Sequence, residues 1–322
     1  MAWNDVLGQE LAKRVFKEHL ASARVPNAYL LAGPEGIGKR RLALEMAKAL
    51  VCERRGVEPC GECRACGQAD RVTHPDVHLI GAQEGSGLIR IEEIRHVVGR
   101  LALKPYSAPF QVAVIKGADR LTEEAANSLL KSLEEPGASA KFLLTTARPQ
   151  HCLPTILSRC QMIRCQGLAS ALIAQALVES KAVDAQAAGV ISRLSGGSVS
   201  RATDLAARWA QHRQFLDRLA EGQAEAWLSQ PLPESRQDVA QLIDGMVGWL
   251  RDVAVAAADA GEAVHAGYEA PLAETARRVD LDRCLETAFE LVILRESIEQ
   301  FVNPKLVASL AREKWLALTV DA

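Results

Sequence analysis

Four of the chain's eight cysteines gather in one short stretch and could together hold a metal ion. They follow the spacing C-x7-C-x2-C-x2-C, at Cys52, Cys60, Cys63 and Cys66. Four thiolates in so short a span fit a closed tetrahedral zinc site, and the glycines and proline between them supply the turns that bring the sulfur atoms together. The pattern therefore predicts a structural zinc ion in a module at residues 52–66, with no coordination position left open for a reaction.

Two other interpretations of these cysteines stay open. An iron–sulfur cluster of the ferredoxin type would want a further Cys-Pro pair three residues downstream, and Asp70 lies near that place instead. The four thiols could also be unrelated to one another. Their clustering favours metal binding in a reducing cytoplasm over disulfide bonds. The remaining cysteines are expected to be buried thiols: Cys152, Cys160, Cys165 and Cys284.

The stretch GPEGIGKRR, residues 33–41, has the glycines and the lysine of a phosphate-binding loop. It follows an apolar run that predicts a strand and precedes a helical pattern, which is the context that this motif requires. Gly33, Gly36 and Gly38 allow backbone N–H groups to converge on phosphate oxygens. Lys39 would neutralise the β and γ phosphates, and the helix N-terminus would add its dipole. The stretch therefore predicts a loop of phosphate-binding ancestry.

Hydrolysis of a nucleotide needs groups that this sequence lacks at the expected positions. Arg40 stands where a hydroxyl would hold magnesium, and a guanidinium can only donate hydrogen bonds. The apolar run 112–115 should end in carboxylates that bind the metal and orient water, but Lys116 and Gly117 follow it. The nearest acid, Asp119, is expected in the turn before the next helix. We therefore expect a loop kept for packing or for passive nucleotide binding, and the sequence leaves open whether ATP, ADP or neither binds.

Composition and charge exclude several classes of protein. The 322 residues are 48% hydrophobic and 24% charged, as in a globular protein with a sizeable core, and the length predicts two or three domains. A net charge of −2 argues against binding nucleic acid by bulk positive charge. The N-terminus lacks the apolar stretch of a signal peptide, and no run of eighteen apolar residues occurs. We expect a cytoplasmic protein that does not insert into a membrane.

The order of apolar runs predicts a parallel α/β domain followed by an all-α region. Nearly continuous apolar runs, typical of strands covered on both faces, alternate with helical patterns in the first half of the chain. The predicted strands are 28–32, 77–80, 112–115, 142–146 and 161–165. After Cys165 the patterns are helical, so the fold class is α/β plus all-α.

Two apolar stripes in the last third of the chain have helical spacing. The first comprises Val239, Leu242, Ile243, Met246, Val247 and Leu250, and the second Leu285, Phe289, Val292 and Ile293. Stripes of this kind usually face the interior of a helical bundle. We expect both to contribute to its core rather than to a cofactor site.

The run 112–137, VAVIKGADRLTEEAANSLLKSLEEPG, resembles the core of bacterial clamp-loader subunits of the AAA+ class. Those proteins carry an aliphatic strand, an Ala-Asp pair and a helix reading Ala-Asn-x-Leu-Leu-Lys-x-Leu-Glu-Glu-Pro. Further matches are IRIEEIR at 89–95, SRC at 158–160 and GGSVSRA at 196–202. Within the family, the absent acids and Arg40 favour the delta-prime type of DNA polymerase III subunit. The gamma/tau type, an active ATPase, is the alternative.

The resemblance implies a fold and a set of partners. Residues 1–166 would form a RecA-like AAA+ domain that carries the zinc module, 167–207 a small helical lid, and 208–322 a helical collar that mediates assembly. The implied function is to help load the sliding clamp onto primed DNA during replication, with little or no ATP hydrolysis by the chain itself. The implied partners are gamma/tau and delta subunits in a hetero-oligomeric ring. Through this ring the chain would also act on the sliding clamp and primer-template DNA.

The resemblance also implies roles for single residues. Arg159, in the Ser-Arg-Cys motif, would be an arginine finger that reaches the nucleotide bound by a neighbouring subunit. Thr146 and Arg201 would take sensor-like positions at the chain's own degenerate phosphate loop. A third function, a zinc-dependent nucleic-acid-binding module, would predict a basic zinc loop with aromatic residues for stacking. The loop instead mixes acids with arginines and has no aromatic residue.

Overall fold

The computed structural model describes residues 3, 6–83, 87–220, 231–261, 263–298 and 302–320. The chain divides into two compact units. The first comprises Met1–Ile173 and Gly196–Arg201, and the second Ala174–Ser195 and Ala202–Ala322. The finer division into a domain, a lid and a collar stays a prediction. Parts of the expected collar, including residues 221–230, lie outside the described residues.

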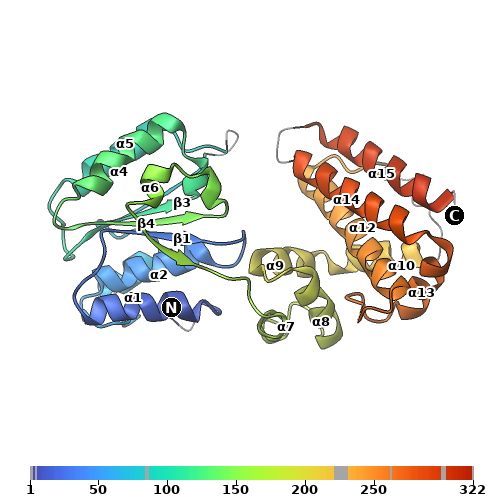
Figure 1. The fold of residues 1–322 in the computed structure, drawn as a ribbon. Helices are drawn as coiled ribbons and strands as arrows, with labels where there is room; N and C mark the ends of the chain where they lie inside the picture. Colours follow the sequence, from blue (N-terminus) through green and yellow to red (C-terminus); the bar gives the residue numbers. More distant parts are fainter. Residues whose placement is uncertain are drawn as a thin grey trace. The chain divides into compact units, whose positions relative to one another are not determined.

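A five-stranded parallel sheet forms the centre of the first unit, as the sequence predicts (Figure 1). Its strands run in the order β2-β3-β4-β1-β5. They are β1 (Ala28–Ala32), β2 (Val77–Gly81), β3 (Gln111–Lys116), β4 (Ala140–Thr146) and β5 (Gln161–Arg164). Because Ala32 pairs with both Thr146 and Arg164, the carboxyl ends of β1, β4 and β5 meet at one edge. Open parallel sheets bind ligands beyond that edge.

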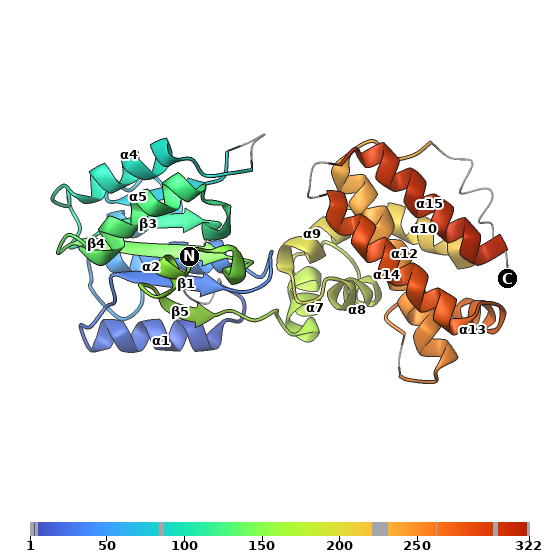
Figure 2. The ribbon, with the colours of Figure 1, turned by 45° about the horizontal axis from the view of Figure 1, so that its top comes forward.

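Helices cover both faces of the sheet (Figures 1 and 2). On one face lie α1 (Glu10–Ala21) and α2 (Lys39–Val51), and on the other α4 (Ile91–Leu101) and α5 (Glu123–Glu134). Leu30 and Phe142 point from the strands into the core beneath α4 and α5. Thr122 caps α5, as the sequence predicts, because its Oγ1 accepts a hydrogen bond from the backbone N–H of Ala125. The sheet with helices on both faces confirms the α/β class.

Short elements connect the strands and follow the sheet. They are α3 (Arg64–Asp70), η2 (Ala118–Arg120), η3 (Pro149–His151) and α6 (Pro154–Leu157). Three helices follow β5: α7 (Ser170–Glu179), α8 (Ala185–Leu194) and α9 (Val199–Ala207). Asp184 caps α8 through its Oδ1, which accepts from the backbone N–H of Ala187 at 2.8 Å.

The remaining helices build a separate core in the second unit, and α12 lies at its centre. They are α10 (Trp209–Ala220), α12 (Arg236–Ala257), α13 (Glu269–Arg278), α14 (Leu281–Ser297) and α15 (Pro304–Val320). Helix α12 packs against α13, α14 and α15. The first apolar stripe of the sequence forms this core: Val239, Ile243, Met246 and Leu250 are buried, and Leu242 and Val247 pack against them. That part of the bundle prediction is confirmed.

The second stripe lies on the outside of α14, so its assignment to the bundle core is wrong. Leu285, Phe289, Val292 and Ile293 are each between 40% and 67% exposed. The helix buries a different face, with Cys284 and Leu291 in the core. Apolar spacing shows that residues share a helix face, but it does not show which face meets the core. Helix α14 is therefore apolar on two sides. Among the described residues no helix, α14 included, is both long and apolar enough to span a bilayer.

Candidate functional site

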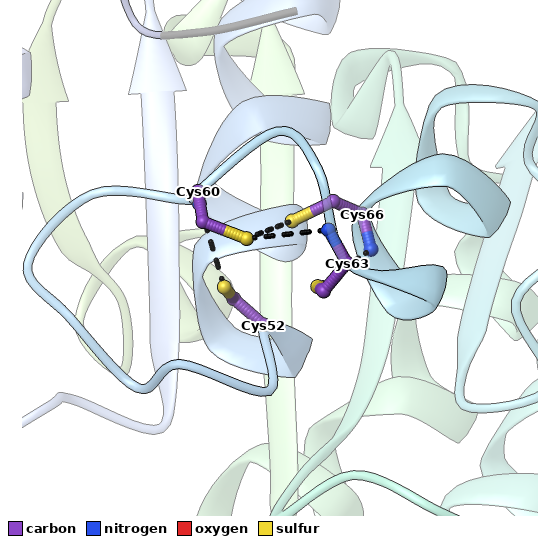
Figure 3. Close-up of side chains that lie close together, drawn as sticks. All are labelled: Cys52, Cys60, Cys63 and Cys66. Atoms are coloured by element: carbon purple, nitrogen blue, oxygen red, sulfur yellow. Dashed lines mark hydrogen bonds between the residues drawn. The ribbon is translucent and has the colours of Figure 1, made fainter.

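The four clustered cysteines meet at the end of α2 and the start of α3 (Figure 3). Their Sγ atoms all lie within 4.8 Å of one another, and those of Cys60 and Cys66 are 3.9 Å apart. In a tetrahedral site with zinc–sulfur bonds of 2.3 Å, the sulfur atoms are about 3.8 Å apart. All four thiols are free, so none is used in a disulfide bond. The residues therefore fit a zinc ion, as the sequence predicts.

Backbone N–H groups support the sulfur atoms of the cluster. The N–H of Cys60 points to Sγ of Cys52, that of Cys63 to Sγ of Cys60, and that of Cys66 to Sγ of Cys63, each at 3.4 Å. The N–H groups of Glu62 and Cys63 lower the pKa of the Cys60 thiol to about 6, because they stabilise the thiolate. Burial instead raises the pKa of Cys66. A cation at the centre would hold all four groups as thiolates.

Charged pairs fix the loop that carries the cysteines. Arg54 and Glu62 form an ion pair at 2.7 Å across the loop, and Oε1 of Glu53 accepts from the N–H of Ala65. Lys17 of α1 reaches Glu58 at 2.5 Å. The loop thus mixes acids with arginines, and Arg54 and Glu62 offset each other's charge. The other cysteines are buried as expected: Cys152, Cys160, Cys165 and Cys284.

The phosphate loop joins β1 to α2 at the carboxyl edge of the sheet. Gly36 and Gly38 have φ angles of +74° and +94°, which residues with a side chain rarely adopt. A Cβ atom on Gly33 would lie 2.1 Å from the backbone oxygen of Cys165, so only glycine fits there. The amine of Lys39 turns back onto the loop, where it donates to the backbone oxygens of Gly33, at 2.6 Å, and of Pro34. Burial lowers the pKa of Lys39.

The carboxylates nearest to Lys39 already have partners. Glu35 pairs with Arg120 at 2.9 Å. The side chain of Asp119 is 2% exposed, and its Oδ1 accepts a hydrogen bond from Oγ1 of Thr146 at 2.7 Å. The hydroxyl of Thr146, the first sensor-like candidate, therefore links the end of β4 to η2. Lys116 and Gly117 supply no carboxylate, and Asp119 lies in η2 beyond the strand end, as expected.

A segment from beyond β5 contacts the phosphate loop at Gly36. The N–H of Ser200 donates to the backbone oxygen of Gly36 at 3.2 Å, and a Cβ on Gly36 would lie 2.0 Å from Oγ of Ser198. Residues 196–201 belong to the same compact unit as the loop. This brings the backbone of Arg201, the second sensor-like candidate, close to the phosphate loop, with its side chain exposed. The contact joins residues more than 150 positions apart and has no signal in the local sequence.

We expect the isolated chain to hydrolyse ATP at no more than the background rate. Arg40, Lys116 and Gly117 cannot hold magnesium or orient water, and Lys39 is bonded to its own loop. Release of phosphate by the purified chain, with and without primed DNA, measures this. Lys39→Ala is the control, since it should leave the rate unchanged. Turnover that exceeds background and disappears in Lys39→Ala would contradict the expectation.

Arg159 lies in the loop between α6 and β5 and is partly exposed. Its Nη1 donates to the backbone oxygen of Thr155 at 3.0 Å and to Oγ of Ser158 at 3.1 Å. Its Nη2 lies 2.6 Å from Oε1 of Glu134, at the end of α5. The resemblance to clamp-loader subunits implies a role for Arg159, but neither it nor the local sequence predicts this pairing. The structure therefore holds the arginine in one place while leaving it accessible at the surface.

Comparisons with known proteins relate the chain to subunits of DNA polymerase III. The family described as "DNA polymerase III, delta subunit" matches residues 8–169. DNA polymerase III subunit delta-prime of Pseudomonas aeruginosa is 38% identical over 159 residues, 49% of this chain and 46% of that protein. The delta-prime subunit of Bacillus subtilis is 36% identical over 168 residues, 51% of this chain and 49% of that protein.

The tau subunit of Bacillus subtilis is 37% identical over 160 residues, which is 49% of this chain and 28% of that protein. The chain thus spans about half the length of the delta-prime relatives it matches. The matched residues 8–169 contain the cysteine module, the phosphate loop and Arg159. Because the family match covers about half of the chain and its curated relatives include several delta-prime subunits, the chain belongs to the delta-prime family of DNA polymerase III subunits.

Proposed function

We propose that the chain is a clamp-loader subunit that does not hydrolyse ATP itself and supplies an arginine to the nucleotide site of a neighbouring subunit. In this role it helps gamma/tau and delta subunits to load the sliding clamp onto primed DNA. The observation that carries the proposal is an asymmetry within the first unit. The phosphate loop lacks its metal ligands and is contacted at Gly36 by Ser198 and Ser200, whereas Arg159 is accessible at the surface.

The geometry at the phosphate loop favours this role over that of an active ATPase. Metal-assisted phosphoryl transfer needs a hydroxyl on the loop and a free carboxylate at the strand end. Arg40 and Lys116 occupy those places, and the carboxylate of Asp119 accepts from Thr146. Any nucleotide in this loop would therefore be held passively, next to the contact that Ser198 and Ser200 make with Gly36.

In the proposed function, the zinc module has a structural role. Its four thiols occupy all positions of a tetrahedral site, so a bound zinc ion would have none left for substrate. The ion would join the C-terminal end of α2 to the N-terminal end of α3. The paired charges of its loop give little attraction for nucleic acid, which disfavours the alternative of a zinc-dependent nucleic-acid-binding module.

Assembly is proposed to use the outer face of α14. Its exposed stripe of Leu285, Phe289, Val292 and Ile293 is contiguous along the helix. Exposed apolar patches of this kind mark interaction surfaces in soluble proteins. The occupant that we propose is a helical domain of a partner subunit, because the delta-prime relatives are named as subunits of a larger polymerase.

Replacement of Phe289 by aspartate tests the assembly surface. Phe289 is 67% exposed, so folding of the second unit should be unaffected. A buried charge in place of an aromatic anchor should weaken association by about 2 kcal/mol or more, at least about 30-fold in Kd. The measurement is co-purification with gamma/tau and delta subunits, followed by the mass of the complex. Leu11→Asp, at another exposed apolar residue, is the control. A complex of normal mass and stability with Phe289→Asp would rule out this surface.

A further inference from the structure

An acidic residue from another element, Glu134, holds the side chain of Arg159. One terminal nitrogen of Arg159, Nη2, lies 2.6 Å from Oε1 of Glu134. The other, Nη1, donates to the backbone oxygen of Thr155 and to Oγ of Ser158. The side chains of Arg159 and Glu134 are 33% and 48% exposed, so a partner could reach both. The chain by itself thus presents an arginine whose charge is already paired.

Glu134 stands where the rules of helix stability disfavour a carboxylate. It is the last residue of α5, and the final carbonyls of a helix carry partial negative charge. The buried side chain of Leu133 anchors this end of the helix to the core, and Pro136 stops the helix just beyond it. A side chain whose charge is unfavourable for its own helix suggests a role in a contact outside that helix.

A terminal phosphate and Glu134 would compete for the same guanidinium group. Arginine binds phosphate through two parallel N–H···O bonds, and both terminal nitrogens of Arg159 already donate. The oxygens of Thr155 and Ser158 are neutral and do not oppose a phosphate. The carboxylate of Glu134 does, because it offsets the positive charge that the arginine brings and repels an approaching anion. The pair has to open before Arg159 can act on a nucleotide.

We infer that Glu134 is a positioning residue that holds Arg159 in an off state until the γ-phosphate of a neighbouring subunit's nucleotide displaces it. The inference rests on the role proposed above for Arg159. Because the pair is exposed, its bias on the equilibrium is modest, on the order of two- to five-fold. A phosphate group with more than one negative charge can therefore displace it. The γ-phosphate then shifts the arginine from the pair with Glu134 toward the nucleotide.

The variant Glu134→Gln in the reconstituted complex tests this inference, because it removes the charge and keeps the size. The Kd of a non-hydrolysable ATP analogue at the neighbouring site should fall about two- to five-fold. The Kd of ADP should not change, since ADP lacks the γ-phosphate. ATP hydrolysis at that site without DNA should rise by a similar factor. Glu135→Gln is the matched control: Glu135 is also exposed, and no ion pair among the described residues involves it.

The Arg159→Ala background separates this inference from the proposed function. Adding Glu134→Gln to Arg159→Ala should have no further effect, since Glu134 acts only through the arginine. Unchanged or weaker binding of the ATP analogue by Glu134→Gln, while Arg159→Ala still lowers hydrolysis, overturns the inference alone. Equal changes for the analogue and for ADP also overturn it, because they indicate a general change of structure. If Arg159→Ala itself has no effect, the role proposed for Arg159 fails, and the inference fails with it.

Discussion

Replacing Cys66 by serine should reduce bound zinc from one ion per chain to well below one and should lower the melting temperature of the first unit. Cys66 lies in α3 and is fully buried with its Sγ facing that of Cys60, so a lost ligand cannot be replaced by water without opening the module. In isolated zinc fingers, metal binding contributes about 10 to 16 kcal/mol to the free energy of folding, or about 3 kcal/mol for each of the four ligands. For a unit of this size that corresponds to a shift of about 6 to 12 °C.

Metal analysis of the purified chain and thermal melting with and without a chelator measure this result. Cys284→Ser is the control, because Cys284 is buried in the second unit and should not change the zinc content. The main sheet should survive in Cys66→Ser, since its core is built by β1–β5 and the helices on both faces. A metal-free chain that melts like the zinc-loaded chain would refute the structural role.

The sequence predicts the parts of the site that depend on local pattern. The five strands begin and end within two residues of their predicted positions, because buried parallel strands are nearly continuous apolar runs. The strand-loop-helix context places the phosphate loop correctly, and the spacing of the four cysteines identifies a cluster that the structure brings together. Each of these features is set by residues close together in the chain.

The features that the sequence could not give depend on contacts between distant residues. Nothing near Gly36 indicates that Ser198 and Ser200 pack against it. Likewise, Asp119 in η2 accepts a hydrogen bond from Thr146, which lies 27 positions later at the end of β4. The outward orientation of the stripe on α14 is a third case, because α14 has apolar residues on two faces and packing against α12 decides which face is buried. Glu134 differs from these cases, because a carboxylate at the C-terminal end of a helix is unfavourable and can be recognised in the local sequence.

Replacing Arg159 by alanine should have the largest effect on the proposed activity. An arginine that reaches a neighbouring nucleotide offsets the charge that develops on the γ-phosphate, and its loss typically costs about 10³ to 10⁵ in rate at that site. In the proposed role, the reconstituted complex should lose a smaller share of its total DNA-stimulated hydrolysis, because only the neighbouring site would lose its arginine. Clamp loading should suffer more than hydrolysis, since it needs the sites to act together.

Folding and assembly should be unaffected in Arg159→Ala, because its contacts are exposed and exposed ion pairs contribute only about 0 to 1 kcal/mol. Arg164→Ala, at an exposed arginine on the last residue of β5, is the matched control and should load clamps normally. Arg159→Lys should restore little activity, since a lysine lacks the planar fork that binds phosphate through two hydrogen bonds. A rate of clamp loading that equals wild type in Arg159→Ala would show that this arginine does not act on the neighbouring nucleotide. The exposed pair with Glu134 would then be an ordinary surface contact.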